Sequence, residues 1–164
     1  MVIIGIDPGY DRLGYGVLQY HRNTFKILEY GSIVTNKDDR FSVRLNNIEK
    51  ALYEICKKYK IDFAAIEELF FNTNTKTAIK VAEARGVILN TLENLKICIN
   101  EYTPLQIKQA VVGYGRADKN QVKYMVKKFL NIENLPKLDD TTDALAVAIC
   151  HGNSFKYIDG VKEK

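Results

Sequence analysis

Carboxylates stand directly after two short apolar runs in this sequence. Asp7 follows Val2–Ile6, and Glu67 and Glu68 follow Phe63–Ile66. Each run is too short for a helix and consists of β-branched, aromatic or small residues, which predicts a buried strand. Because an open sheet gathers its sites at the carboxyl ends of strands, we expect the two acidic ends to lie close together.

A third acidic group opens the last helical pattern of the chain. Asp140 and Asp143 are three residues apart and therefore share one face of a first helical turn. Asp139 is four residues from Asp143 and has the same property, so spacing alone does not choose between Asp139 and Asp140. Taken singly, each carboxylate also has an ordinary explanation as a helix cap, a charge at a helix start or a surface strand end.

Four carboxylates at one place predict a metal site. They repel one another, and unless their pKa values rise the arrangement needs cations to neutralise it. Carboxylate oxygens are hard ligands that suit Mg²⁺, with Mn²⁺ as an alternative. Two such ions about 4 Å apart activate a water on one side of a phosphodiester and stabilise the departing oxygen on the other. The chemistry indicated is therefore hydrolysis of nucleic acid.

Hydrophobic periodicity predicts the elements that must position these groups, and they give an α/β fold. Strands are expected at Val2–Ile6, Leu13–Leu18, Phe25–Val34, Phe63–Ile66 and Ile97–Tyr102. Helices are expected at Arg40–Tyr59, Thr73–Lys96, from Thr103-Pro104 onward, Asn120–Leu130 and Asp140–Cys150. Pro8-Gly9 requires a turn between the first two strands, so the first three strands should be antiparallel. Gly31 predicts a bulge in the third strand.

The long pattern at Thr73–Lys96 is apolar on more than one face. Two explanations remain open: a central helix packed on two sides, or a helix at a dimer interface. The segment Gly113–Lys119, with its two glycines and two basic residues, predicts an exposed loop.

Length and composition suit one globular domain. With 164 residues and 46% hydrophobic content, we expect it at residues 1–153, followed by a polar, flexible tail at residues 154–164. A formal charge of +4 is compatible with a polyanionic partner but does not by itself indicate one. The N-terminal apolar run is shorter than a signal-peptide core or a membrane span, so we expect a soluble protein that is not exported and has no membrane partner.

The three cysteines do not form a disulfide or metal-binding pattern. Cys56, Cys98 and Cys150 are odd in number, lack C-x-x-C spacing, and each lies among apolar residues. We interpret all three as small buried hydrophobic residues, which is typical of a reducing cytoplasm.

Several segments together resemble the RuvC family of bacterial Holliday junction resolvases, over nearly the whole chain. They are GIDPG with GYGV after it, AIEELFF, EARG, QIKQAVVGYGRADKNQV and DDTTDALAVAICH. The resemblance implies an RNase H-like fold with a mixed five-stranded sheet, three strands antiparallel and two parallel, and a symmetric homodimer. It also implies that the catalytic and metal-binding acids are Asp7, Glu67, Asp140 and Asp143, which decides against Glu68 and Asp139.

The same resemblance implies residues that bind DNA. Lys108 and Lys119 match basic positions near the junction, where a fixed positive charge holds phosphate or stabilises transition-state charge. Phe70 matches an aromatic residue that stacks on opened bases, while its neighbour Phe71 is expected in the core. Arg116, in the glycine loop, is a further candidate for a phosphate contact.

The sequence departs from the family pattern at three positions. Tyr10 stands where a small hydroxyl residue is expected, Leu13 stands where threonine is expected, and Asp139 is an extra acid. These departures affect the turn and the acidic group, where DNA contacts are expected. His151 lies about 16 Å along the helix from Asp140, so we expect it to cap the negative end of the helix and not to bind metal.

The implied function is a Mg²⁺-dependent endonuclease that nicks four-way DNA junctions symmetrically, in recombination and repair. The resemblance also implies cooperation with RuvA and RuvB. Three alternatives remain: a related nuclease of ribosomal RNA precursors, a junction-binding protein without catalysis, and an actin-like ATPase. The ATPase would need two lobes, for which the chain is too short.

Overall fold

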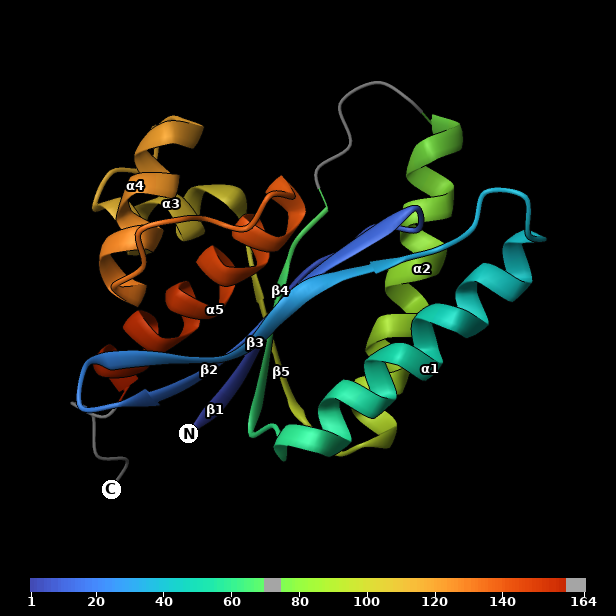
Figure 1. Ribbon diagram of the computed structural model, residues 1–164, viewed down its shortest axis with the longest axis horizontal. Coiled ribbons are helices and arrows are strands. Elements are labelled where there is room, and N and C mark those ends of the chain that lie inside the picture. The colour runs from blue at the N-terminus through green and yellow to red at the C-terminus, as the bar shows by residue number, and fades with distance from the viewer. Residues whose placement is uncertain (70–74, 159–164) are drawn as a thin grey trace.

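A mixed five-stranded sheet forms the centre of the molecule in the computed structural model, which describes residues 1–69 and 75–158 (Figure 1). The strands lie in the order β3-β2-β1-β4-β5. Their bounds are β1 Val2–Asp7, β2 Arg12–His21, β3 Thr24–Val34, β4 Phe63–Glu67 and β5 Cys98–Tyr102. β1, β2 and β3 are antiparallel neighbours, whereas β4 runs parallel to β1 and β5 runs parallel to β4. The predicted α/β fold with this sheet is confirmed.

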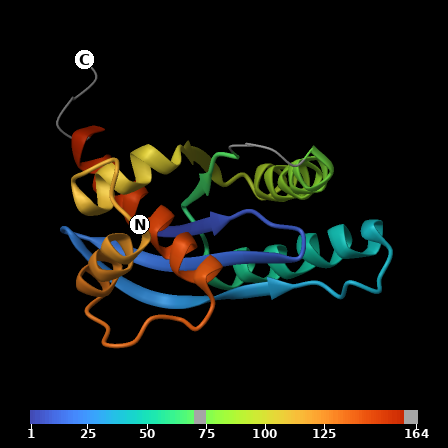
Figure 2. The same cartoon turned by 90° about the horizontal axis from the view of Figure 1, so that it is seen from above.

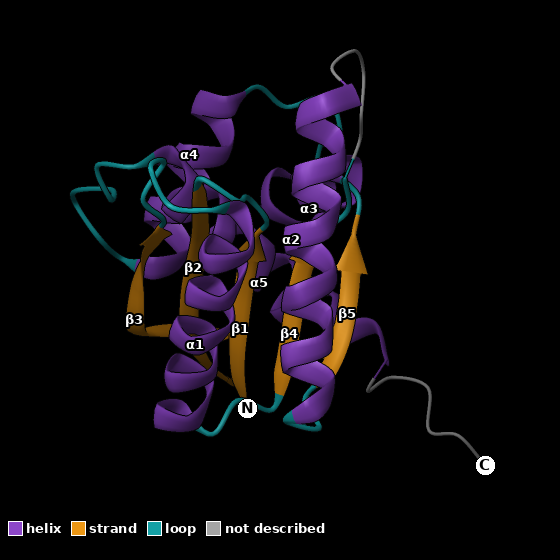
Figure 3. Cartoon of the chain, turned by 90° about the vertical axis from the view of Figure 1, so that its right-hand side faces the viewer, coloured by secondary structure: helices purple, strands orange, loops and turns teal. Residues whose placement is uncertain are grey.

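Helices cover both faces of the sheet (Figures 1 and 2). Two lie on one face, as Figure 3 shows from their side: α1 Phe41–Tyr59 and α2 Thr75–Asn94. Three lie on the other: α3 Pro104–Val112, α4 Lys119–Leu130 and α5 Asp139–Ile158. None of the helices in the described part of the chain has the length and apolar character that crossing a membrane requires.

Alternation along β1 builds a separate core on each face. Ile4 packs with Ile48 of α1 and Ile88 of α2 in one buried cluster. Ile3 packs in the other cluster, which contains Leu145 of α5. Successive side chains of a strand point to opposite faces, so a continuous apolar run fills both cores at once.

Glycines let α5 lie directly on the two central strands. A Cβ atom on Gly5 would lie 2.1 Å from the carbonyl oxygen of Ala144, and one on Gly16 would lie 2.5 Å from Leu145 Cδ2. At Gly5 the nearest atoms belong to the helix backbone, so a larger residue there would push α5 away. At Gly16 an added atom would meet the side chain of Leu145 first.

The bulge in β3 lies elsewhere than predicted. Gly31 pairs regularly with Tyr15, and the register instead shifts opposite Val17 and Leu18, which leaves Leu28 as the extra residue. A Cβ atom on Gly31 would lie 2.9 Å from the hydroxyl oxygen of Tyr15. The glycine thus makes room for a tyrosine ring, and the prediction of a bulge there was wrong.

Three local predictions are corrected near the end of the chain and on β5. The last helix does not end at Cys150 but continues to Ile158, so the helix extends into the segment expected as a polar tail. His151 does not cap a helix end: it is 2% exposed, and its Nδ1 lies 2.7 Å from the hydroxyl of Tyr102. Burial lowers its pKa to about 4.

Cys98 is exposed, because it lies on the edge strand, whereas Cys56 is buried as expected.

Candidate active site

Two of the predicted acids meet at the carboxyl ends of neighbouring parallel strands. Gly5 of β1 stands opposite Ala65 of β4, so Asp7 and Glu67, each two residues farther, lie next to each other. Gly5 contacts α5, and Ala65 belongs to the core beneath α5. Because side chains alternate, Asp7 and Glu67 point to the α5 face, while Glu68 does not.

The start of α5 brings a third acid over the same strand ends. Gly14 of β2 pairs with Asp7, and a Cβ atom on Gly14 would lie 2.1 Å from the carbonyl oxygen of Asp140. The next residue, Thr141, hydrogen-bonds through its hydroxyl to that of Ser32 on β3, at 2.8 Å. The first turn of α5 is thus fixed against two strands, which places Asp140 close to Asp7.

Replacing Gly14 by alanine is expected to displace Asp140 and to abolish most hydrolysis of four-way DNA, the activity that the sequence predicts. The added methyl group would overlap the helix backbone and destabilise the fold by about 1–3 kcal/mol. Gly16→Ala is the matched control, because its Cβ meets the side chain of Leu145 first, whereas that of Gly14→Ala meets the helix backbone at Asp140. Urea unfolding and cleavage should be measured together, and equal cleavage by both folded variants would contradict the argument.

Burial and mutual repulsion show how costly these charges are without a cation. Burial first, and then the charges of Glu67, Asp143 and Asp140, raise the pKa of Asp7 to about 8. Burial and the charge of Asp143 also raise the pKa of Glu67. Asp7 is influenced by all three other acids, so the four carboxylates form one electrostatic group.

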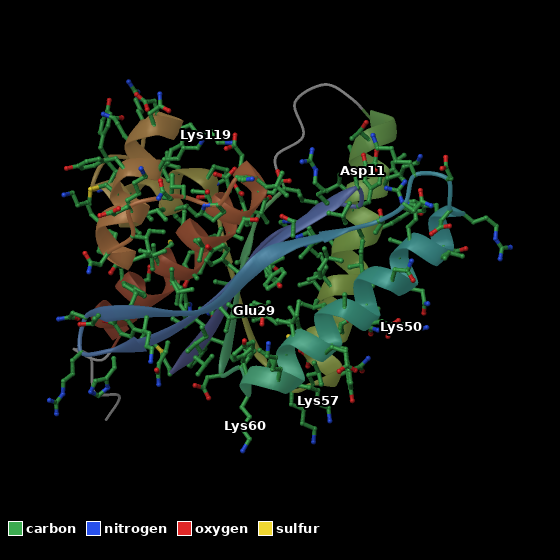
Figure 4. All side chains as sticks on the ribbon, viewed as in Figure 1. Asp11, Glu29, Lys50, Lys57, Lys60 and Lys119 are labelled. Atoms are coloured by element: carbon green, nitrogen blue, oxygen red, sulfur yellow. The ribbon has the colours of Figure 1, made fainter. Side chains whose placement is uncertain are left out.

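Lysines partly neutralise this group. Lys119 is the first residue of α4 (Figure 4). Its Nζ lies 3.1 Å from an oxygen of Asp143 and 3.2 Å from an oxygen of Asp139. Lys123, one turn later, lies 2.7 Å from the other oxygen of Asp139. Although burial opposes it, hydrogen bonding and attraction to Asp143 and Asp139 raise the pKa of Lys119. Arg12 adds a cation on the other side, with Nε 3.5 Å from Asp140.

A cavity of about 240 Å³ opens beside the acids. Glu67, Asp143, Lys108 and Lys119 supply its charged lining, and its apolar lining comes from Pro104, Ile107, Val122 and Ala146. Lys108 lies on α3, whose N-terminus is held by a capping box between Thr103 and Gln106. The helix start predicted at Thr103-Pro104 is confirmed. The cavity combines fixed anions with fixed cations, which suits a metal ion together with a phosphate.

The four carboxylates are suitable ligands for a hard divalent cation, although their side chains do not converge on one point in the structure. Among the residues that the structure describes, no cluster of three or more acidic, histidine or cysteine side chains stands ready to hold a metal. Asp140 and Asp143 are turned to Arg12 and Lys119 instead. The donor set is nonetheless all carboxylate oxygen, and the raised pKa of Asp7 reflects negative charge that a cation would relieve.

The structure brings six of the eight predicted site residues together around this cavity and the adjoining strand ends. They are Asp7, Glu67, Asp140, Asp143, Lys108 and Lys119. Arg116 is exposed on the loop between α3 and α4, and Phe70 and Phe71 lie outside the described residues. Sequence reasoning missed Arg12 and Lys123. Arg12 could have been predicted from its place in the sequence, because a basic residue at the start of the strand after the Asp7 turn lies near the acidic end of β1.

Comparison with known proteins gives one consistent result. A model of the family described as "Crossover junction endodeoxyribonuclease RuvC" matches residues 3–151. Proteins of that description from Petrotoga mobilis and Alkaliphilus oremlandii are 54% and 52% identical to the chain, over 95% and 100% of it and 98% and 100% of their own lengths. The solved structure "T. thermophilus RuvC in complex with Holliday junction substrate" matches with a TM-score of 0.91 at 30% identity, over 96% of each chain.

Proposed function

The chain belongs to the RuvC family of crossover junction endodeoxyribonucleases, and we propose that it resolves four-way DNA junctions by nicking two strands symmetrically in recombination and repair. The observation that carries this proposal is the electrostatic group of four carboxylates at the ends of β1 and β4 and the start of α5. The junction-bound structure of the relative from T. thermophilus, which has the same fold over nearly its whole length, supports the substrate.

We assign the metal ligands to Asp7, Glu67, Asp140 and Asp143. Two Mg²⁺ ions, or Mn²⁺ in their place, would supply an activated water and a Lewis acid for the leaving oxygen. The carboxylates would orient these charges, since Asp7 and Glu67 are fixed by strands and Asp140 by helix-on-strand contact. Asp143, which now accepts a bond from Lys119 through one carboxylate oxygen, would give at least one oxygen to the cation.

The lysines would act on the DNA. Lys119 and Lys108 line the cavity that contains Glu67 and Asp143, so a phosphate bound there meets two positive charges. Such fixed charges hold the scissile phosphate and stabilise the charge that develops on it. Arg116, on the exposed loop before α4, would contact a phosphate farther along a junction arm. Phe70, from the position that it shares with the family, would stack on opened bases.

We also propose that the protein is a homodimer, whose twofold symmetry would match the symmetry of the junction. The outer face of α2 supports this: Ile79 is 61% exposed, and Ala82 and Gly86, which share its face of the helix, are also exposed. An exposed apolar stripe of this kind is typical of an interface. Action in the cytoplasm and cooperation with RuvA and RuvB belong to the same proposal.

Ile79→Glu is expected to weaken the dimer at least about tenfold, because a charge would have to be buried in an apolar interface. Sedimentation over a range of concentrations measures this change. Leu105→Glu is the matched control, since Leu105 is 62% exposed on α3, on the opposite face of the sheet. If both variants dimerise like the wild type, α2 is not the interface.

The decisive test of the function is cleavage of a mobile four-way DNA junction by the purified protein, with Mg²⁺ or with a chelator. Paired nicks at symmetric positions in the presence of Mg²⁺, and none on linear duplex, are the expected result. Tight junction binding without any cut would favour a binding protein. Cleavage of structured RNA in preference to the junction would favour the ribosomal RNA nuclease.

A further inference from the structure

A buried arginine of α1 holds the turn between β1 and β2. Arg44 is 6% exposed, and its Nη2 donates to the carbonyl oxygen of Tyr10 at 3.1 Å and to a carboxylate oxygen of Asp11. Its guanidinium carbon also lies 5.1 Å from the centre of the Tyr10 ring. One side chain thus contacts two successive residues of the turn through backbone, carboxylate and ring.

Thr35, which follows β3, completes this cluster. Its hydroxyl accepts a hydrogen bond from Arg44 Nε at 2.8 Å and donates one to the carbonyl oxygen of Tyr10 at 2.7 Å. Its backbone N–H donates to the carbonyl oxygen of Asp11 at 3.1 Å. We call Tyr10, Asp11, Thr35 and Arg44 the turn clamp. It joins three elements that are separate in the sequence.

The position of the turn gives the clamp a functional meaning. The residue immediately before the turn segment Pro8–Asp11 is Asp7, and the residue immediately after it is Arg12, which pairs with Asp140. Any movement of the turn therefore moves a proposed metal ligand and the cation that restrains another.

Stability alone does not explain such a cluster. Burying the Arg44 guanidinium is costly, and its partner Asp11 is 45% exposed, so the ion pair offsets little of that cost. The planar guanidinium of Arg44, by contrast, donates hydrogen bonds in fixed directions to Thr35, Tyr10 and Asp11, and so fixes the position of the turn in a way that apolar packing does not.

We propose that Arg44 is a positioning residue of the metal site, which acts by fixing the β1–β2 turn through the turn clamp. This inference rests on the proposed function, because it concerns the carboxylates assigned there. Arg44 touches neither DNA nor metal in this role. It acts through Tyr10 and Asp11.

Two substitutions test the clamp without changing net charge. Arg44→Lys keeps the positive charge but loses the fork, and Thr35→Val keeps the shape but loses the hydroxyl. Thr35→Ser retains the hydroxyl and serves as the conservative variant. Tyr59→Phe is the matched control, because the Tyr59 hydroxyl donates to Glu29 at 2.6 Å and so also joins α1 to β3. Figure 4 shows Glu29 well away from Asp11.

The main readout is Mn²⁺ affinity, measured by calorimetry on the DNA-free protein, with Mg²⁺-dependent junction cleavage and melting temperature beside it. Arg44→Lys and Thr35→Val should weaken Mn²⁺ binding and raise the half-saturating Mg²⁺ concentration about tenfold, the lower end of the effect of losing a group that bonds a metal ligand directly. Thr35→Ser and Tyr59→Phe should stay within about twofold of wild type. Junction binding in chelator should change less than Mn²⁺ affinity, because the basic residues Lys108, Lys119 and Arg116 are untouched.

Wild-type metal affinity in both clamp variants, even with lower melting temperatures, would overturn the inference and leave the clamp a purely structural feature. If Arg44→Lys does not fold, the comparison of Thr35→Val with Thr35→Ser decides. A wild type that binds Mn²⁺ but never cuts junctions would refute the proposed function, and the calorimetric comparison would still decide the clamp.

Discussion

Asp7→Asn is expected to reduce junction cleavage by more than about a hundredfold while junction binding in chelator stays near the wild-type level. Loss of an outer-shell partner of a metal ligand already costs about 10- to 100-fold, so loss of a ligand charge should cost more. Binding should persist because Lys108, Lys119 and Arg116 are untouched. Single-turnover cleavage and gel-shift titration on the same junction measure the two quantities.

Asp62→Asn is the control for the loss of one acidic charge. Asp62 lies at the opposite end of the same sheet, just before β4, where its carboxylate accepts a bond from the Val2 N–H at 2.7 Å. Asparagine retains an oxygen for that bond, so cleavage should be unchanged.

Asp7→Asn should also raise thermal stability near neutral pH in metal-free buffer, because a charge that is costly to bury is removed. Cleavage by Asp7→Asn at the rate of Asp62→Asn would refute the assigned role.

Lys119→Met is expected to lower the single-turnover cleavage rate by about 10²–10³-fold, comparable to the loss of one preorganised group that stabilises transition-state charge. The methionine keeps most of the apolar stem, so the loss reports the ammonium group. Junction affinity should fall less than the rate, because other basic residues still bind phosphate. A rate measured at saturating protein separates the two effects.

Lys123→Met provides the matched control one helical turn away. Among the acids that the structure describes, Lys123 pairs with Asp139 only, whereas Lys119 pairs with both Asp139 and Asp143. Its removal should change the rate by no more than a few-fold, since surface ion pairs contribute little. Similar losses in the two variants would mean that the rate depends on general positive charge on α4 and not on the ammonium group that Lys119 places in the cavity.

Sequence patterns correctly predicted those parts of the fold that depend on interactions within a few residues. The apolar run before Asp7, the turn at Pro8-Gly9 and the cap at Thr103 each act within a few residues, and the structure has the expected strand, turn and helix there. The meeting of Asp7 and Glu67 followed from one general property of parallel strands. The choice of Glu67 over Glu68 depended on the family resemblance. It is also consistent with strand alternation from Ala65, once the α5 face is known.

The remaining features depend on contacts between distant segments. The salt bridge of Arg12 with Asp140 joins residues from the two ends of the chain, and the clamp by Arg44 requires α1 to pass over a turn formed thirty residues earlier. His151 was predicted to cap the last helix because that helix was predicted to end at Cys150. The helix continues to Ile158, and the partner of the His151 ring is Tyr102 of β5. Such contacts follow from packing, which a pattern along one segment does not contain.

The contact of α5 with β1 also has a consequence during synthesis. Because a ribosome makes the chain from its N-terminus, Asp7 and Glu67 emerge long before the helix that bears Asp140 and Asp143. A nascent chain with all five strands would still lack Asp140 and Asp143, two of the four proposed metal ligands. If the four acids act as proposed, the order of segments delays DNA cleavage until nearly the whole polypeptide has been made.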